Sequence, residues 1–229
     1  MNNVSARILL GIDTSSRYLR LGLTFGGDRL VQSNEESERS HGQFIIKKIG
    51  ELFQSASLQP AALEGIVVCV GPGSFTGLRI GLAAAKGMVT ALDIPLVPVT
   101  VFEIAAFRLR HVKETVHVVI PLNRDECIVG PVKDGDCEQE LARVVKYNQL
   151  FETVGNDAVA AMGFLLHERY PEVPVVDYTD QLDWQAADLL HLGREKLLKG
   201  EIADPAILEP LYLQKSQAEI RFEERQQKD

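Results

Sequence analysis

Residues 71–81 read GPGSFTGLRIG, and this stretch constrains the fold more than any other part of the chain. The apolar run 66–70 precedes it, and the largely apolar segment 78–92 follows it. Four glycines therefore fall where a strand has to turn into a helix, and glycine permits positive φ angles and the close approach of other atoms. Unpaired N–H groups at the start of such a helix can bind an anion. Two interpretations stay open: the turn holds a phosphate group, or its helix holds another protein.

The segments on either side of this turn alternate between strand-like and helix-like patterns, and this order is typical of an α/β fold. The first part of the chain predicts strands at residues 7–12, 19–25, 29–34, 65–70 and 96–99 and helices at residues 41–56, 78–92 and 101–109. The second part predicts strands at residues 115–120, 126–132, 158–162 and 173–176 and helices at residues 147–154, 164–170 and 184–199. We therefore expect an N-terminal lobe over residues 1–110, which carries the GPGSFTGLRIG motif, and a smaller C-terminal lobe over residues 111–229 with a charged tail.

The composition is typical of a globular protein. The 229 residues are 45% apolar and carry a formal net charge of −8, whereas a protein that binds nucleic acid by itself usually has a basic surface. The three cysteines, Cys69, Cys127 and Cys137, form no CxxC pair, and Cys69 is expected to be an inert core thiol in an apolar strand. No apolar run is long enough to span a bilayer, and the N-terminus lacks the pattern of a signal peptide. We therefore expect a cytoplasmic protein that does not associate with membranes.

None of the common catalytic motifs is present in the sequence. A P-loop requires a lysine and a hydroxyl residue after its last glycine, but Leu78 and Arg79 follow Gly77. No acidic residue stands in the position that a dinucleotide-binding fingerprint requires. The five histidines form no HxxxH pair, and the sequence around Ser74 is not the GxSxG turn of a serine hydrolase. The sequence therefore predicts neither catalytic residues nor a metal site.

A short polar turn, Asp13-Thr14-Ser15-Ser16, follows the first expected strand. Hydroxyl and backbone N–H groups in this turn could hold a phosphate, and the Asp13 carboxylate could hold Mg²⁺ through water. Such a site would be a vestigial nucleotide loop formed by Asp13, Thr14 and Ser15. The alternative interpretation is an Asx or ST turn that closes a hairpin.

The helix expected after the glycine turn is apolar nearly all round, so it has to be covered on more than one side. Gly77, Gly81 and Ala85 recur every four residues and form a groove with almost no side chain. Small residues at this spacing allow two helices to pack closely. The helix either lies sandwiched inside one domain or contributes to a subunit interface.

Several motifs occur in a fixed order along the chain. They are IDTSS at 12–16, SHGQFIIKKIGELF at 40–53, GPGSFTGLRIGLAAAKGM at 71–88, IPLVPVT at 94–100 and PLYLQ at 210–214. This set resembles the bacterial TsaB family, also called YeaZ. The resemblance implies the α/β fold of the actin-like/sugar-kinase/Hsp70 (ASKHA) class of ATPases. In this class two lobes each contain a mixed sheet with flanking helices, and here the second lobe would be reduced.

The resemblance also implies a function in making threonylcarbamoyladenosine (t6A) at position 37 of tRNAs that read ANN codons. Family members do not catalyse the transfer. They bind and support their catalytic paralogue TsaD, and the ATPase TsaE joins the pair, so tRNA would be contacted only through the complex. The paralogue has an HxxxH metal site, whereas His41 of this chain is followed by Phe44 and Ile45. We therefore expect a pseudo-enzyme that needs no cofactor of its own, with ATP or ADP and Mg²⁺ acting only at the interface of the complex.

In the family, the helices that correspond to residues 41–56 and 78–92 form the dimerisation face, where two subunits build a four-helix bundle. The resemblance therefore implies a partner interface that contains His41, Ile45, Ile49, Gly77, Leu78, Gly81, Leu82, Ala85 and Val89. The same face could pair with itself to give a homodimer when the chain is alone.

An enzyme that acts alone is the alternative hypothesis, either an actin-fold ATPase or a metallopeptidase-like enzyme. The Asp13 turn favours the ATPase, and only kinship favours the metallopeptidase. One segment departs from the family pattern: where the family usually has a DARRGEVY-like strand, residues 121–128 read PLNRDECI. Arg124 and Glu126 are retained, but the leading Asp and the trailing Tyr are not, so the resemblance assigns no role to this segment.

Overall fold

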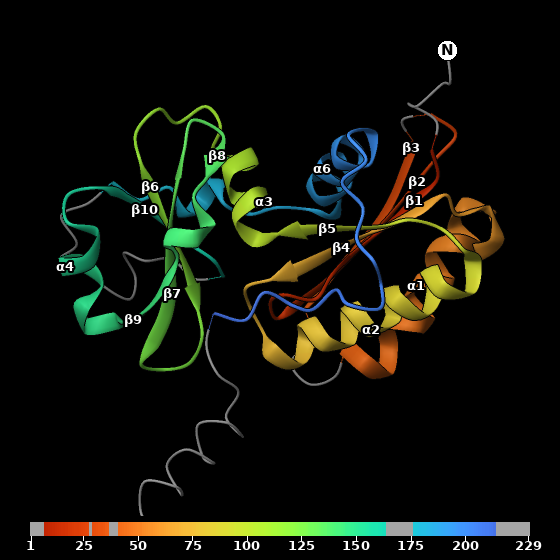
Figure 1. The fold of residues 1–229 in the computed structure, drawn as a ribbon, viewed down its shortest axis with the longest axis horizontal. Coiled ribbons are helices and arrows are strands. Elements are labelled where there is room, and N and C mark those ends of the chain that lie inside the picture. The colour runs from red at the N-terminus through yellow and green to blue at the C-terminus, as the bar shows by residue number, and fades with distance from the viewer. Residues whose placement is uncertain (1–6, 28, 37–40, 164–175, 214–229) are drawn as a thin grey trace, which may run out of the picture.

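The computed structural model describes residues 7–27, 29–36, 41–163 and 176–213, which form two lobes around two mixed sheets (Figure 1). The first sheet has the order β3-β2-β1-β4-β5, with strands β1 (Leu9–Asp13), β2 (Tyr18–Phe25), β3 (Arg29–Glu36), β4 (Gly65–Gly71) and β5 (Leu96–Thr100). The second sheet has the order β10-β6-β7-β8, and β9 also pairs with β7. Its strands are β6 (Val116–Pro121), β7 (Glu126–Lys133), β8 (Asp136–Cys137), β9 (Arg143–Lys146) and β10 (Ala158–Ala161).

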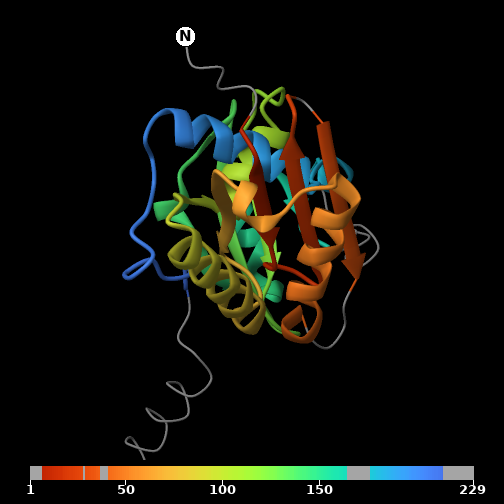
Figure 2. The same ribbon diagram turned by 90° about the vertical axis from the view of Figure 1, so that its right-hand side faces the viewer.

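The centre of the first sheet is apolar because helices cover both of its faces. β4 pairs in parallel with β1 and β5, and each of its residues is buried. On one face lie α1 (His41–Ala56) and α2 (Phe75–Leu92), which pack side by side against the sheet (Figure 2). On the other face lies α6 (Ala186–Leu198), whose Leu190 side chain fills the space above Gly11 and Gly22.

The two lobes share one hydrophobic core. Helix α3 (Val101–Arg108) contacts both sheets and α6, so the apolar side chains of β4, β5, β6 and β7 form one continuous cluster with it. A second cluster lies under α1 and α2, and a third lies between the second sheet and α4 (Leu150–Val154). Short 3₁₀ turns complete the described part: η2 (Pro60–Ala62), η3 (Gln139–Leu141), η4 (Tyr147–Gln149) and η5 (Thr179–Gln181). Within the described ranges, no helix has both the length and the apolar character that crossing a membrane requires.

The expected division at residue 110 separates the two sheets but not the helices that cover them. Although α6 comes from the C-terminal half of the sequence, it packs mainly on β1, β2 and β5 of the first sheet. The segment that follows it also returns to this lobe. Ala203 forms a bridge with Leu96, and the Leu211 N–H donates to the Val70 carbonyl oxygen at 2.7 Å. The first lobe is therefore completed by described residues from the C-terminal half of the chain.

Most expected elements occur within a few residues of their expected bounds. Helix α2 begins at Phe75 instead of Leu78, because the Ser74 side chain accepts a hydrogen bond from the Gly77 N–H and caps it. The short strands β8 and β9 were not expected, since neither is long enough to show an alternating pattern. The helix expected at 164–170, most of the strand expected at 173–176 and the charged tail lie outside the described residues.

Candidate functional site

The polar turn after β1 and the glycine motif after β4 form one structural unit. At Gly71, φ is +102°, a conformation that favours glycine and that starts the turn between β4 and α2. The Ser74 N–H donates to the Ser15 carbonyl oxygen at 2.7 Å. A Cβ atom added at Gly73 would collide with this same oxygen, and one added at Gly77 would collide with the Thr14 carbonyl oxygen. The glycines therefore allow the turn and the helix to approach each other at backbone distance.

The groove expected to receive a partner helix is filled from inside the chain. A Cβ atom added at Gly81 would collide with the Thr14 hydroxyl, so Thr14 occupies the space that the glycines leave open. The expected interface residues on α2 are all buried in the isolated chain: Gly77, Leu78, Gly81, Leu82, Ala85 and Val89. Ile45 and Ile49 of α1 are buried as well, and the surroundings of the His41 side chain lie outside the described residues. In this structure these residues pack on the first sheet and on the polar turn, and their part in a contact with a partner stays a prediction.

The opposite side of the two helices is open and carries several small side chains. On α2, Ala83, Gly87 and Ala91 are exposed, and a Cβ atom added at Gly87 would meet nothing within 4 Å. On α1, the Ile46 residue is 62% exposed, and Gly42 lies next to Ile80 of α2. We call this surface the outer face, defined by Ile46 and Gly50 of α1 and by Ile80, Ala83, Gly87 and Ala91 of α2. Its small side chains would let another helix approach closely.

Both oxygens of the Asp13 carboxylate are engaged in contacts within the chain. It is fully buried and forms an ion pair with Arg20, whose Nη1 lies 3.3 Å from Oδ2. Trp184 Nε1 donates to the same oxygen at 2.9 Å, and the N–H and hydroxyl of Ser15 donate to Oδ1 at 2.9 and 2.6 Å. The Arg20 guanidinium also lies over the Trp184 ring, 4.6 Å from its centre. Asp13 therefore fixes the turn and docks the segment before α6, which agrees with the Asx-turn interpretation.

These contacts bear on the ATP and Mg²⁺ that an actin-like fold implies. A Mg²⁺ site needs oxygen ligands with free lone pairs. Each of the two Asp13 carboxylate oxygens already accepts two hydrogen bonds. The residues present therefore do not fit Mg²⁺. In this structure Asp13, Thr14 and Ser15 form a hydrogen-bonded turn, and a vestigial nucleotide loop there stays a prediction. The sequence could not indicate Trp184 as a partner, because it lies 171 residues from Asp13 and no local pattern links them.

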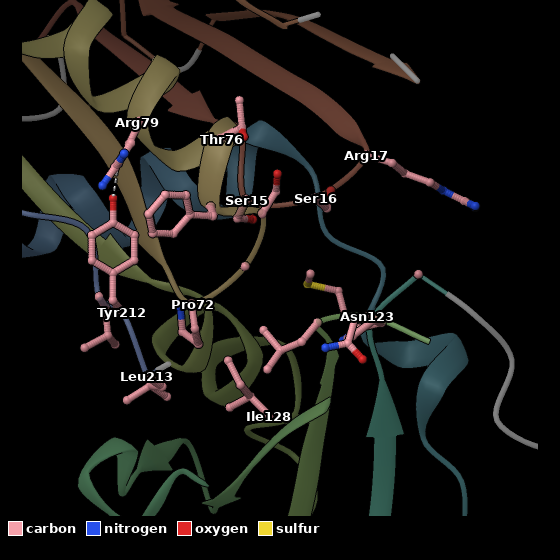
Figure 3. A pocket seen from close by; sticks show the side chains of 18 residues that line it. Ser15, Ser16, Arg17, Pro72, Thr76, Arg79, Asn123, Ile128, Tyr212 and Leu213 are labelled. Carbon is pink, nitrogen blue, oxygen red and sulfur yellow. Dashed lines mark hydrogen bonds between the residues drawn. The ribbon is translucent and has the colours of Figure 1, made fainter. Parts of the chain in front are cut away.

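A cavity of about 750 Å³ lies between the lobes, beside this turn (Figure 3). The first lobe contributes Ser15 and Ser16 of the polar turn, the glycine turn from Pro72 to Ser74, and Phe75, Thr76 and Arg79 of α2. The second lobe contributes Asn123, Ile128 and Met162, and the late segment Leu211–Leu213 closes one side. The lining contains the arginines Arg17 and Arg79 but, among the described residues, no Asp, Glu, His, Cys or Lys. The cavity thus offers cationic and hydroxyl groups on apolar walls, without a carboxylate to act as a general base or a metal ligand.

Two of the three cysteine thiols, those of Cys69 and Cys137, are poor nucleophiles. Burial raises the pKa of the Cys69 thiol well above its ordinary value, as expected for a core residue. Burial also raises the pKa of Cys137 to about 11. Both thiols therefore stay protonated near neutral pH, and the nucleophilic thiolate form is rare. Within the described ranges, no three His, Cys, Asp or Glu side chains gather closely enough to hold a metal ion.

The chain is similar to proteins of one family over most of its length. The family model "TsaD: tRNA N6-adenosine threonylcarbamoyltransferase" matches residues 33–177. The tRNA threonylcarbamoyladenosine biosynthesis protein TsaB of Bacillus subtilis (strain 168) is 27% identical, and the similarity covers 95% of this chain and 99% of that protein. The TsaB protein of Haemophilus influenzae is 32% identical over 127 residues, which is 54% of this chain and 53% of that protein.

Solved structures give the same result. YeaZ from Pseudomonas aeruginosa is 28% identical and superposes with a TM-score of 0.72, over 90% of this chain and all of that chain. A second Pseudomonas aeruginosa protein, described as similar to peptidase YEAZ, is 27% identical with a TM-score of 0.71. Two lobes with mixed sheets and flanking helices confirm the expected ASKHA-type α/β fold. The chain belongs to the family that the TsaD model describes and, within it, to the TsaB proteins, also called YeaZ.

Proposed function

We propose that the chain is a non-catalytic subunit of the complex that makes t6A on tRNAs reading ANN codons, and that it binds a TsaD-type partner through its outer face. The observation that carries this proposal is the exposed, small-residue surface of α1 and α2 in a member of the TsaB family. Exposed apolar surface on a domain often marks the place where another protein packs. The outer face replaces the buried residues of the earlier prediction, while the two helices stay the same.

The chemistry of the cleft supports a role without catalysis by this chain. Its lining lacks a carboxylate, an imidazole and a thiol among the described residues, so no general base or metal ligand is at hand. Among the residues that the structure describes, the buried acid beside it is Asp13, which is bound to Arg20 and Trp184. Under this proposal ATP and Mg²⁺ act in the complex, through TsaD and the ATPase TsaE, and tRNA is contacted through the complex. An ATPase or metallopeptidase acting alone would need a carboxylate or an imidazole, which the described lining does not supply.

The test places a charge on the outer face. Gly87→Arg should leave the isolated chain folded, because a side chain at this position enters open space and arginine favours helix more than glycine does. It should abolish co-purification with the TsaD paralogue, since a charge buried without a partner costs several kcal/mol. It should also abolish t6A formation in a mixture of TsaD, TsaE, threonylcarbamoyl-adenylate and tRNA.

Ser55→Arg is the matched control. Ser55 is exposed on α1 and lies nine residues after Ile46, so it faces the opposite flank of that helix. It should retain both the complex and the modification activity. Complex formation by Gly87→Arg would show that the interface lies elsewhere, and t6A formation without this chain would refute the proposed function.

Native mass spectrometry of the isolated chain and of Gly87→Arg tests in the same way whether the outer face forms a homodimer.

A further inference from the structure

The late motif PLYLQ has no part in the proposed function, although its described residues form a wall of the interlobe cavity. Leu211 is held to the end of β4 by the hydrogen bond from its N–H to the Val70 carbonyl oxygen. The Tyr212 ring stacks beside Phe75, with ring centres 4.7 Å apart. The Tyr212 hydroxyl accepts a hydrogen bond of 2.9 Å from Arg79 Nε (Figure 3). Two segments 133 residues apart in the sequence therefore build one edge of the cavity.

Arg79 is held in place at this edge but has no anionic partner. Its guanidinium carbon lies 4.0 Å from the centre of the Phe75 ring, and Tyr212 holds its Nε. No carboxylate among the described residues forms an ion pair with it, and its two terminal nitrogens donate to no described residue. A guanidinium that is already oriented loses little conformational entropy when it binds a carboxylate or a phosphate through two parallel hydrogen bonds.

The rest of the cavity is suited to the body of an organic molecule. Thr76 lies one helical turn before Arg79 and lines the same cavity, so its hydroxyl extends the polar end. Away from this end, the walls include the apolar side chains of Pro72, Leu122, Ile128, Met162 and Leu213, with Ser15, Ser16, Arg17 and Asn123 among them. The volume of about 750 Å³ lies within the range of small-molecule sites. A polar, cationic end and apolar walls match a molecule with one anionic group on an apolar body.

The geometry points to a binding site in this cavity for a small organic anion, in which Arg79 holds a carboxylate or phosphate group and the interlobe walls hold an apolar or planar body. The site works without a divalent metal ion, because no described residue of the lining carries a carboxylate. This inference concerns the cavity between the lobes and does not depend on the role of the outer face.

The experiment titrates the full-length chain with two probes that share one body and differ in the anion, 1-naphthoate and 1-naphthyl phosphate, in the presence of EDTA. Isothermal titration calorimetry should detect binding of at least one probe in the millimolar range or tighter, and the better probe identifies the anion. The uncharged 1-naphthol should bind at least about tenfold more weakly, because a hydrogen bond to a charged group is lost.

Arg79→Met removes the charge but keeps an apolar side chain over Phe75, and it should weaken binding of the better probe by about tenfold or more. Arg110→Met is the control, since Arg110 lies over the Phe107 ring in the same way, 4.3 Å from its centre, but away from the cavity. Tyr212→Phe keeps the ring and removes the hydroxyl that orients Arg79, so it should weaken binding several-fold. Unfolding curves in urea report whether each variant is folded.

Three results would overturn the inference. The first is the absence of detectable binding by either probe at 10 mM, a concentration of about ten times a millimolar dissociation constant. The second is equal affinity of the folded Arg79→Met and wild-type chains. The third is binding that appears only when Mg²⁺ replaces EDTA. Each of these results would leave complex formation through the outer face unaffected, so the two proposals fail separately.

Discussion

The two sides of helix α2 carry similar residues and differ in what lies against them. The inner side has Gly77, Gly81 and Ala85, and the outer side has Ala83 and Gly87. On the inner side, an added Cβ atom collides with Thr14, whereas at Gly87 it meets nothing within 4 Å. Small residues at helical spacing thus serve intramolecular packing on one side and leave an open surface on the other. The spacing alone does not distinguish these two uses.

The inner side is filled because a network of polar groups holds the turn against it. Asp13 links the turn to Arg20 on β2 and to Trp184 before α6. The turn then presents the Thr14 carbonyl and hydroxyl groups to the glycines of α2. The outer side has no such element in the described part of the chain. The comparison can therefore be tested from either side: by loosening the turn, by crowding the inner side, or by filling the outer side.

The largest effect is expected from Asp13→Ala, which releases the turn. The substitution leaves the buried guanidinium of Arg20, whose side chain is 4% exposed, without its carboxylate and removes the acceptor of the Trp184 N–H. Breaking a buried ion pair in this way costs about 3–5 kcal/mol of the free energy of unfolding. Urea denaturation followed by Trp184 fluorescence measures the loss. Asp183→Ala, at an exposed position next to Trp184, should change stability by less than about 0.5 kcal/mol. Equal effects of the two substitutions would contradict the role given to Asp13.

Gly81→Ala crowds the inner side and should be the next most damaging change. The new methyl group would collide with the Thr14 hydroxyl, so the helix or the turn has to move. Overpacking of this kind costs about 1–3 kcal/mol, which outweighs the gain in helix propensity. The cost should fall markedly in a Thr14→Ala background, because the colliding hydroxyl is then absent. A cost that is the same in both backgrounds would mean that Thr14 is not what fills the inner side.

The sequence predicted what depends on local pattern and missed what depends on distant contacts. Helix α1 has the expected bounds because its apolar stripe is unambiguous, and β4 was expected because its apolar run is bounded by turn residues. The sequence could not separate the inner and outer sides of α2, since both are apolar or small and a periodicity of four residues does not show which side faces the sheet. Only the position of Thr14 in space decides which side is filled.

The candidate sites also depend on contacts between residues that are distant in the sequence. For each of the motifs IDTSS and GPGSFTGLRIG, the sequence left open a phosphate site or a role in packing. In the structure the two motifs pack against each other. Trp184, the partner of Asp13, and Tyr212, the partner of Arg79, lie far away in the sequence. No spacing rule could connect these pairs, although the occurrence of PLYLQ in the ordered motif set was a signal that this late segment packs near the glycine turn.

Thr14→Val tests the fit on the inner side with a smaller expected effect. The Thr14 hydroxyl is buried and has no hydrogen-bond partner among the described residues. Valine has nearly the same shape, so it should keep the packing against Gly81 and remove the cost of burying an unpaired polar group. We expect a gain of about 1 kcal/mol in the free energy of unfolding. Thr14→Ser, which keeps the hydroxyl and loses the methyl group, should instead destabilise the chain. A loss of stability in Thr14→Val would show that the hydroxyl has a stabilising partner.

Gly87→Ala is the mildest change and gives the sharpest contrast with Gly81→Ala, because the same substitution in the same helix should have the opposite sign. At Gly87 the added methyl group enters open space, so the only remaining effect is the lower conformational entropy of the unfolded backbone. Replacing glycine by alanine within a helix stabilises it by about 0.5–1 kcal/mol. Urea denaturation of the two variants, measured side by side, should therefore move the midpoint up for Gly87→Ala and down for Gly81→Ala. If both variants were stabilised, the inner side would be as open as the outer side, and the partner helix could dock on either one.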